Sequence, residues 1–143
     1  STIFNEKFDV IFFWDVLEHV YDINETIKIC NDYLNHNGLL IINYPCYSSA
    51  VSRFLGKKWP FWLSVHLSYF NKETLNNFLH NYNMYFVDEF NHIQSLKLEY
   101  IFERAKKIIP SLKILGFILK NKFIKKLKVN YYLGQKLYVS RKK

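Results

Sequence analysis

Near its start the chain reads FDVIFFWDVLEHV, from Phe8 to Val20. The apolar run Val10 to Trp14 passes directly into Asp15, and Glu18 and His19 follow closely. A short, uninterrupted apolar run closed by polar residues predicts a strand buried on both faces, as in a parallel sheet. Ligands of open α/β sheets bind beyond the carboxyl ends of such strands. The polar residues therefore mark either a functional site or a solvated helical turn, and their spacing alone does not separate the two.

A helix and a second strand are predicted next. Asp22 or Asn24 can cap a helix whose apolar residues recur at helical spacing. The helix is expected to end at Asn37-Gly38, because glycine suits a left-handed cap. The run LLIINY, Leu39 to Tyr44, then predicts a second buried strand. Strand, helix and strand together predict a right-handed, parallel βαβ unit.

After Pro45 the sequence predicts an irregular, aromatic stretch. It contains a short helix around residues 49–55, the basic and aromatic loop Lys57 to Trp62, and the run VHLSYF from Val65 to Phe70. Aromatic loops at the carboxyl end of a sheet either form substrate walls or pack as a structural lid.

The remaining elements are read from capping and periodicity. Asn71 is expected to cap a helix, residues 84–90 predict a third strand and residues 136–140 a last one. Between these strands we expect a helix over roughly 95–109, which Pro110 breaks, and a second, more basic helix to about residue 127.

The composition describes one domain with an uneven charge. Half of the 143 residues are hydrophobic and 19% are aromatic, which is enough for a real core. Two isolated cysteines favour a reducing cytoplasm over secretion, and no apolar run approaches the ~20 residues of a membrane span. Through Ile93 there are 6 Lys or Arg against 10 acids, whereas from Gln94 onward there are 14 against two. This asymmetry predicts a negatively charged partner for the C-terminal third, either a membrane surface, a nucleic acid or an anionic substrate.

Three motifs in order carry a family resemblance. The chain combines a strand followed by DVLEH, a helix followed by NGLLIINYP, and then HLSYF before the next helix. This order resembles the second half of class I S-adenosylmethionine-dependent methyltransferases. It is most similar to the branch that includes the ubiquinone-biosynthesis O-methyltransferases. The resemblance covers roughly residues 8–90 and resumes at the last strand.

The resemblance implies an α/β fold, namely part of a Rossmann-like methyltransferase sheet with a helical insertion before the last strand. The four strands predicted above would be strands four to seven, the last antiparallel. Trp14, Asp15 and Val16 would lie beside the adenosine of the cofactor, and His19 near its methionine end. The whole of residues 1–143 would form the C-terminal part of one methyltransferase domain, with residues 94–130 as a basic insertion.

One family feature is missing from this chain. Relatives hold the cofactor through a glycine-rich turn that precedes the region seen here, and no two of the four glycines lie close enough to form one. We therefore expect the chain alone to bind S-adenosylmethionine weakly or not at all, and its start to be a cut end. Without the upstream half of the domain, the first strand would also be an unpaired, aggregation-prone edge.

The chemistry of methylating a hydroxyl points to histidine. The acceptor must be aligned and its proton removed, and imidazole suits that task near neutral pH. His66 is the candidate catalytic base, and Trp59, Trp62 and Tyr69 are candidates for binding the acceptor; each has a structural alternative within the loop. In some relatives an acid-x-x-Glu-His run holds a divalent metal, which here would use Asp15, Glu18 and His19 with His66. Asp15 is shorter than the family's Glu, and most members of the branch need no metal, so we expect none.

The sequence thus predicts a methyltransferase that acts on a small-molecule or a glycan- or lipid-linked acceptor. The alternative is a catalytically inactive remnant that serves as a binding or membrane-docking module. The basic insertion predicts binding to an anionic membrane surface or a solvated insert packed on its own domain. Nucleic acid is the weaker alternative, because no base-reading module accompanies the lysines. The expected location is cytoplasmic, with membrane association through the insertion.

Overall fold

The computed structural model describes residues 6–108, 111 and 127–143. The chain forms two compact units. The first comprises Ser1–His92 together with Gly134–Lys143, and the second comprises Ile93–Leu133.

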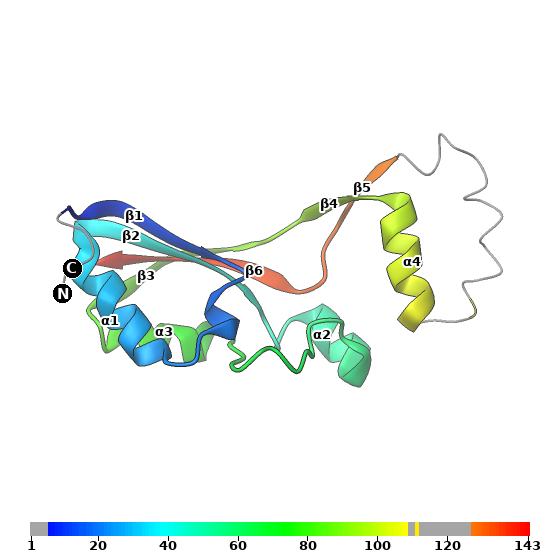
Figure 1. The fold of residues 1–143 in the computed structure, drawn as a ribbon, viewed down its shortest axis with the longest axis horizontal. Helices are drawn as coiled ribbons and strands as arrows, with labels where there is room; N and C mark the ends of the chain where they lie inside the picture. The colour runs from blue at the N-terminus through cyan, green and yellow to red at the C-terminus, as the bar shows by residue number, and fades with distance from the viewer. Residues whose placement is uncertain (1–5, 109–110, 112–126) are drawn as a thin grey trace. The chain divides into compact units, whose positions relative to one another are not determined.

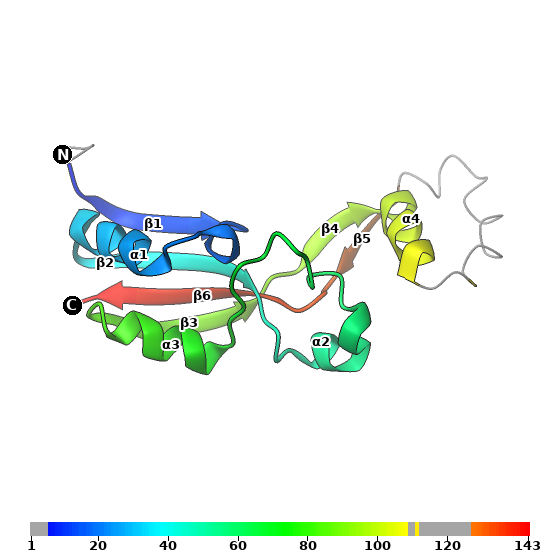
Figure 2. The same ribbon diagram turned by 60° about the horizontal axis from the view of Figure 1, so that its bottom comes forward.

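The first unit is built on one four-stranded sheet. Its strands are β1 (Phe8–Trp14), β2 (Leu34–Pro45), β3 (Met84–Asn91) and β6 (Gln135–Lys142), in the order β1-β2-β6-β3. Figure 2 shows these strands side by side in that order. β1 and β2 are parallel, whereas β6 is antiparallel to both of its neighbours. The structure therefore confirms the predicted α/β class, with the parallel βαβ unit and an antiparallel last strand.

Three helices and two single 3-10 turns complete the described part of the first unit. The helices are α1 (Ile23–Tyr33), α2 (Ala50–Leu55) and α3 (Lys72–His80), and the turns are η1 (Leu17–His19) and η2 (Gly56–Lys58). α1 and α3 begin at the predicted caps. The Asp22 carboxylate accepts a hydrogen bond from the Glu25 amide, and Asn71 forms a reciprocal capping box with Thr74.

The core lies on the sheet face that α1 and α3 cover (Figure 1). The register pairs Ile11 with Leu40 and Phe13 with Ile42, so these side chains point to the same face. Ile11 and Phe13 pack against a cluster of buried residues from the sheet and the helices. That cluster includes Leu40, Ile42, Tyr44, Tyr138, Ile27, Leu75 and Leu79.

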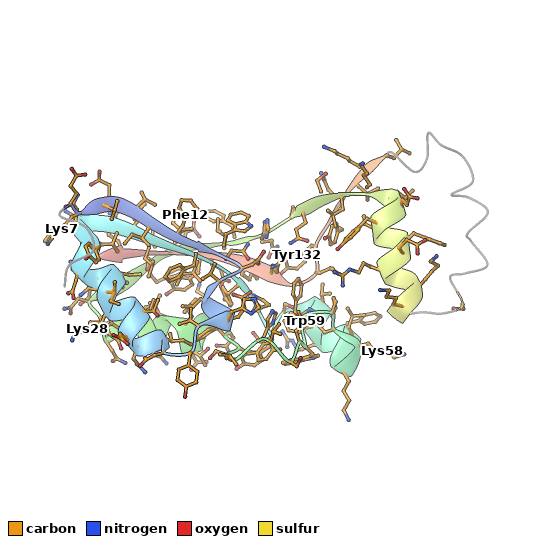
Figure 3. All side chains as sticks on the ribbon, in the orientation of Figure 1. Lys7, Phe12, Lys28, Lys58, Trp59 and Tyr132 are labelled. Carbon is orange, nitrogen blue, oxygen red and sulfur yellow. The ribbon has the colours of Figure 1, made fainter. Side chains whose placement is uncertain are left out.

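The opposite face shows that one prediction was wrong, since β1 is not buried on both faces. Val10, Phe12 and Trp14 alternate with the core residues and are 46%, 65% and 51% exposed. Figure 3 shows Phe12 pointing away from α1 and α3. The reason is that both of these helices lie on the other side of the sheet, and that β1 occupies its edge. Among the described strands β1 pairs only with β2, as predicted for a hydrophobic edge strand.

The end of α1 also differs from the prediction. The helix stops at Tyr33, and Leu34 already pairs with Phe8 as the first residue of β2. Gly38 is not a helix cap. A Cβ atom at this position would lie 2.9 Å from the Asn35 carbonyl oxygen and 3.2 Å from that of Asp9, so glycine permits the close approach of the two strands.

The second unit contains a two-stranded ribbon that the sequence did not predict. β4 (Gln94–Lys97) pairs antiparallel with β5 (Lys128–Tyr131), and α4 (Leu98–Ile108) follows β4. Residues 95–97 are thus strand rather than helix, because they pair with residues far away in the sequence. The second predicted helix lies outside the described residues, apart from its ends at residues 111 and 127. No helix in the described part of the chain is long and apolar enough to cross a membrane.

Candidate functional site

The candidate site lies at one end of the strands, which we call the carboxyl edge of the sheet. Here the carboxyl ends of β1 and β2 meet the first residue of β6. Pro45 at the end of β2 pairs with Gln135, and Asn91 at the end of β3 pairs with Lys136, so all four strands reach this edge. The carboxyl edge of an open α/β sheet is the usual place for a ligand.

A chain of polar contacts crosses this edge. Asp15, directly after β1, has a positive φ of 51°, which is uncommon for a residue other than glycine. Its carboxylate accepts a 2.6 Å hydrogen bond from the side-chain amide of Gln135. The buried Asn43 amide contacts Nδ1 of His92 at 2.7 Å, and the His92 ring packs edge-on against Trp14 with centroids 4.8 Å apart. These contacts fix the exit of β1.

Gln135 and Asn43 were not predicted as site residues, and no role was predicted for His92. Asn43 carried the one available signal, because it is a buried amide within the apolar run LLIINY. A buried amide normally needs a hydrogen-bond partner. Its partner, His92, comes from a distant connector and could not be read from the pattern.

The turn η1 presents the LEH motif with its three side chains in different surroundings. Leu17 is fully buried in the core, Glu18 is 2% exposed and His19 is exposed. Two backbone amides of the aromatic loop between η2 and α3, those of Leu67 and Ser68, donate to the Glu18 carbonyl oxygen at 2.7 and 3.3 Å. These two backbone hydrogen bonds hold the loop, and with it His66, next to the LEH turn.

His19 has a defined orientation. Its Nδ1 lies 2.9 Å from the carbonyl oxygen of Val65. A carbonyl only accepts, so Nδ1 carries the proton and donates it. In the neutral ring Nε2 is then left with a lone pair, which can bind a metal ion or accept a proton.

Glu18, His19 and His66 form one cluster. A ligand atom from each lies within 4.8 Å of the others, and the two imidazole centroids are 4.7 Å apart. Within the described residues, two buried atoms of this cluster have no hydrogen-bond partner, Oε2 of Glu18 and Nδ1 of His66. Buried polar atoms are normally paired, so two unpaired atoms in one cluster indicate a place for a ligand or an ion.

Burial shifts the pKa values of Glu18 and His66 in opposite directions. Burial raises the pKa of Glu18, and the nearby Asp15 carboxylate adds to that effect. Burial also lowers the pKa of His66, followed by the effect of His19. Both shifts favour the neutral form of each group. A neutral imidazole is the form that accepts a proton or binds a metal ion.

The aromatic loop is held together by its own side chains. Trp59 is 2% exposed and packs edge-on against Phe61 and Trp62, with centroids 5.4 and 5.2 Å away. The Tyr69 hydroxyl donates to the Phe61 carbonyl oxygen and accepts from the Leu63 amide, both at 3.0 Å. Trp62 also packs on Tyr69 at 4.7 Å but is 45% exposed. Of the three aromatic residues predicted to bind an acceptor, Trp62 offers the largest accessible surface.

The structure brings some predicted site residues together and separates others. His19 and His66 are neighbours, and Glu18 lies in the same cluster. Asp15 is not part of this group, because its side chain is bonded to Gln135. Trp14 and Val16 flank the strand exit and are exposed. The functional roles predicted for these residues stay predictions.

Sheet order, strand directions and the polar edge define one side of a class I methyltransferase fold. Residues 3–89 match the model of a methyltransferase-domain family, and the chain belongs to that family. No curated protein matches the chain.

Solved structures agree with this assignment. A SAM-dependent methyltransferase of Thermotoga maritima, described as a possible histamine N-methyltransferase, is 17% identical with a TM-score of 0.54 over 96% of this chain and 57% of its own. The magnesium protoporphyrin IX methyltransferase of Synechocystis is 10% identical with a TM-score of 0.54, over 99% of this chain and 48% of its own. The YcgJ protein of Bacillus subtilis is 14% identical with a TM-score of 0.57, over 100% and 68%. Identities this low show a shared fold, and the chain spans about half the length of the first two proteins.

Proposed function

We propose that the protein takes part in S-adenosylmethionine-dependent methylation of a hydroxyl group on a small molecule or on a glycan- or lipid-linked acceptor. The observation that carries this proposal is the cluster of Glu18, His19 and His66 at the carboxyl edge of a methyltransferase-type sheet. The similarity of its DVLEH and HLSYF motifs to the O-methyltransferase branch supports a hydroxyl acceptor.

The strand exit fits one side of the cofactor. Trp14 and Val16 are 51% and 43% exposed, and Trp14 is held edge-on by His92, so their surfaces are available to a flat ring. S-adenosylmethionine, when bound, supplies a methyl group activated by a positively charged sulfur. Trp14, Asp15, Val16 and His19 would hold it from this side, and a glycine-rich turn for the other side is not found in this chain.

His66 is suited to be the base. Its Nδ1 is buried and has no hydrogen-bond partner among the described residues, and the lowered pKa of the ring favours its neutral form at neutral pH. In this proposal Nδ1 accepts the proton of the acceptor hydroxyl, while the exposed ring of Trp62 orients the acceptor.

A second arrangement of the same cluster is favoured by the unpaired oxygen of Glu18. Oε2 of Glu18, Nε2 of His19 and Nδ1 of His66 would hold a divalent cation such as magnesium or manganese. Such an ion would lower the pKa of a bound hydroxyl and reduce the need for a protein base.

The test is transfer of tritiated methyl from S-adenosylmethionine by the whole protein into a cell extract, followed by partition of the label between aqueous and lipid phases. Label in the aqueous phase indicates a small or glycan-linked acceptor, and label in the lipid phase a lipid-linked one. The variant His66→Ala is expected to lower transfer at least about tenfold, as loss of a general base does. The matched control is His36→Ala, which removes an exposed histidine near the start of β2. No transfer and no cofactor binding would favour the inactive module, and an unchanged rate in His66→Ala would remove this residue from the mechanism.

A further inference from the structure

The second unit accounts for the whole net charge of the protein. Residues Ile93–Leu133 contain ten Lys or Arg and two Glu, whereas the first unit contains ten basic and ten acidic residues. The first unit is therefore neutral and the second carries all of the formal +8. A charge confined to one compact unit indicates an anionic partner for that unit.

The β4–β5 ribbon places two of these charges directly opposite each other. Lys97 pairs with Lys128 across the ribbon, and both side chains are exposed. Like charges at directly opposite positions destabilise an antiparallel pair. Among the described residues no carboxylate forms an ion pair with either lysine. An external anion would remove this repulsion.

The described residues of the same unit include exposed apolar side chains. None of these described residues is buried. Leu127 and Val129 on or beside β5 are 57% and 38% exposed, and Tyr100 on α4 is 48% exposed. A two-stranded ribbon is marginally stable by itself, so these side chains favour contact with a further apolar surface.

Cationic and aromatic groups are paired on α4. The Arg104 guanidinium lies 5.5 Å from the ring of Tyr100, and the Lys106 ammonium lies 5.2 Å from the ring of Phe102. A long basic side chain that extends past an aromatic ring can place its charge among lipid headgroups while the ring enters the boundary below.

We propose that the described residues of the second unit bind the surface of an anionic lipid bilayer through Lys97, Lys128 and the basic residues of α4, with Leu127 and the α4 aromatic rings entering the interface. This contact lies parallel to the membrane and does not span it. The inference does not depend on methyl transfer, because its test measures binding alone.

The test uses the whole chain and co-flotation with vesicles. Vesicles of phosphatidylcholine alone are compared with vesicles that also contain phosphatidylserine, at low salt and at ~1 M salt, where the screening length is about 3 Å. Binding is expected with phosphatidylserine at low salt only. No binding to the anionic vesicles at low salt overturns the proposal.

Two double variants with the same change in net charge locate the surface. Lys97→Gln with Lys128→Gln is expected to weaken binding about 30-fold, since each lysine near an anionic surface contributes a factor of about five. Removal of the like-charge pair also stabilises the ribbon, so loss of folding would not explain the result. Lys7→Gln with Lys28→Gln removes two exposed lysines of the first unit and should leave binding nearly unchanged. Equal weakening by both double variants overturns the assignment to the second unit.

A further variant distinguishes a lipid partner from a nucleic-acid partner. Leu127→Ser keeps the charge and should weaken vesicle binding while leaving the binding of a fluorescent single-stranded oligonucleotide unchanged. If the oligonucleotide binds and the anionic vesicles do not, the partner is a nucleic acid. If Leu127→Ser leaves vesicle binding unchanged, the contact is charge alone and the proposed insertion of apolar groups is wrong.

Discussion

The side-chain amide of Gln135 donates a 2.6 Å hydrogen bond to Oδ1 of Asp15, a residue 120 positions earlier in the chain. Gln135 is 3% exposed and begins β6, whereas Asp15 follows β1 with a φ of 51°. The hydrogen bond therefore connects two segments that lie far apart in the sequence, at the point where the backbone leaves the edge strand β1. A positive φ at a residue other than glycine persists only where surrounding contacts hold it.

Replacing Gln135 with Ala is expected to destabilise the fold. The variant removes the donor to Asp15 and is predicted to lower the free energy of unfolding by about 1–2 kcal/mol. Urea denaturation followed by circular dichroism measures this. Asp15→Asn is the matched control, because Asn keeps an acceptor oxygen and tolerates a positive φ. Asp15→Val should lower the free energy of unfolding more than either variant, since a β-branched residue is strained at a positive φ. Equal stability of Gln135→Ala and the parent would show that the bond does not hold the turn.

Patterned segments were the part of the fold that the sequence could predict. The apolar runs of β1 and β2 gave the parallel pair, and Asp22 and Asn71 gave the helix starts, because caps and periodicity are local. Gly38 was misread as a helix cap because a close approach to a neighbouring strand leaves no local signal. The β4–β5 ribbon was missed for the same reason, since Gln94 pairs with Tyr131.

The candidate site was predictable only in part. The LEH turn and His66 were singled out individually, and their approach to one another depends on the backbone bonds from Leu67 and Ser68 to Glu18. Because these hydrogen bonds join backbone groups, no residue type in the sequence indicates them. The resemblance to metal-binding relatives grouped Asp15 with the histidines, but in the structure its carboxylate accepts a hydrogen bond from Gln135.

Because Phe12 and Phe13 point to opposite faces of β1, substitutions at these two positions are expected to affect stability very differently. Phe12 is 65% exposed and Phe13 packs against the core. Phe12→Lys should leave stability nearly unchanged and reduce self-association of the chain, because a charge on an edge strand discourages strand pairing. Phe13→Lys should cost about 3 kcal/mol or more, as loss of a core aromatic does. Light scattering gives the association state and urea denaturation the stability. Similar losses in both variants would contradict the assignment of faces.

The buried thiol of Cys30 predicts a loss of stability at alkaline pH. Burial raises the pKa of Cys30 to about 11 from a usual value of 9.0. Between these values the unfolded thiol ionises while the folded thiol stays protonated, so stability falls as the pH rises. The contribution is on the order of 2 kcal/mol. The parent is therefore expected to lose that much more stability than Cys30→Ala between neutral pH and pH ~11, as measured by urea denaturation. The subtraction cancels other groups such as Tyr138, and identical losses would show that the thiol does not contribute.

Cofactor affinity tests the contribution of this chain to the proposed function. Trp14 and Val16 provide exposed contact surface, but no two of the glycines Gly38, Gly56, Gly116 and Gly134 lie close enough in sequence to form a glycine-rich turn. Without a close backbone approach we expect weak or undetectable binding of S-adenosylmethionine to the chain by isothermal titration. A dissociation constant in the low-micromolar range would disprove this expectation.

Metal addition and removal distinguish the two arrangements proposed for the cluster of Glu18, His19 and His66. If the cluster holds a cation, magnesium or manganese at about 100 times its dissociation constant should stabilise the folded chain by about 2.7 kcal/mol, and a chelator should reverse the effect. Thermal unfolding measures this without any need for activity. Glu18→Gln is expected to abolish the response. Without metal it should be as stable as the parent or more stable, because it removes a buried carboxylate with an unpaired oxygen. Glu73→Gln, at an exposed position in the first turn of α3, is the matched control and should respond like the parent. If no metal changes the unfolding temperature and methyl transfer by the whole protein survives the chelator, the metal arrangement is excluded and His66 remains as the base.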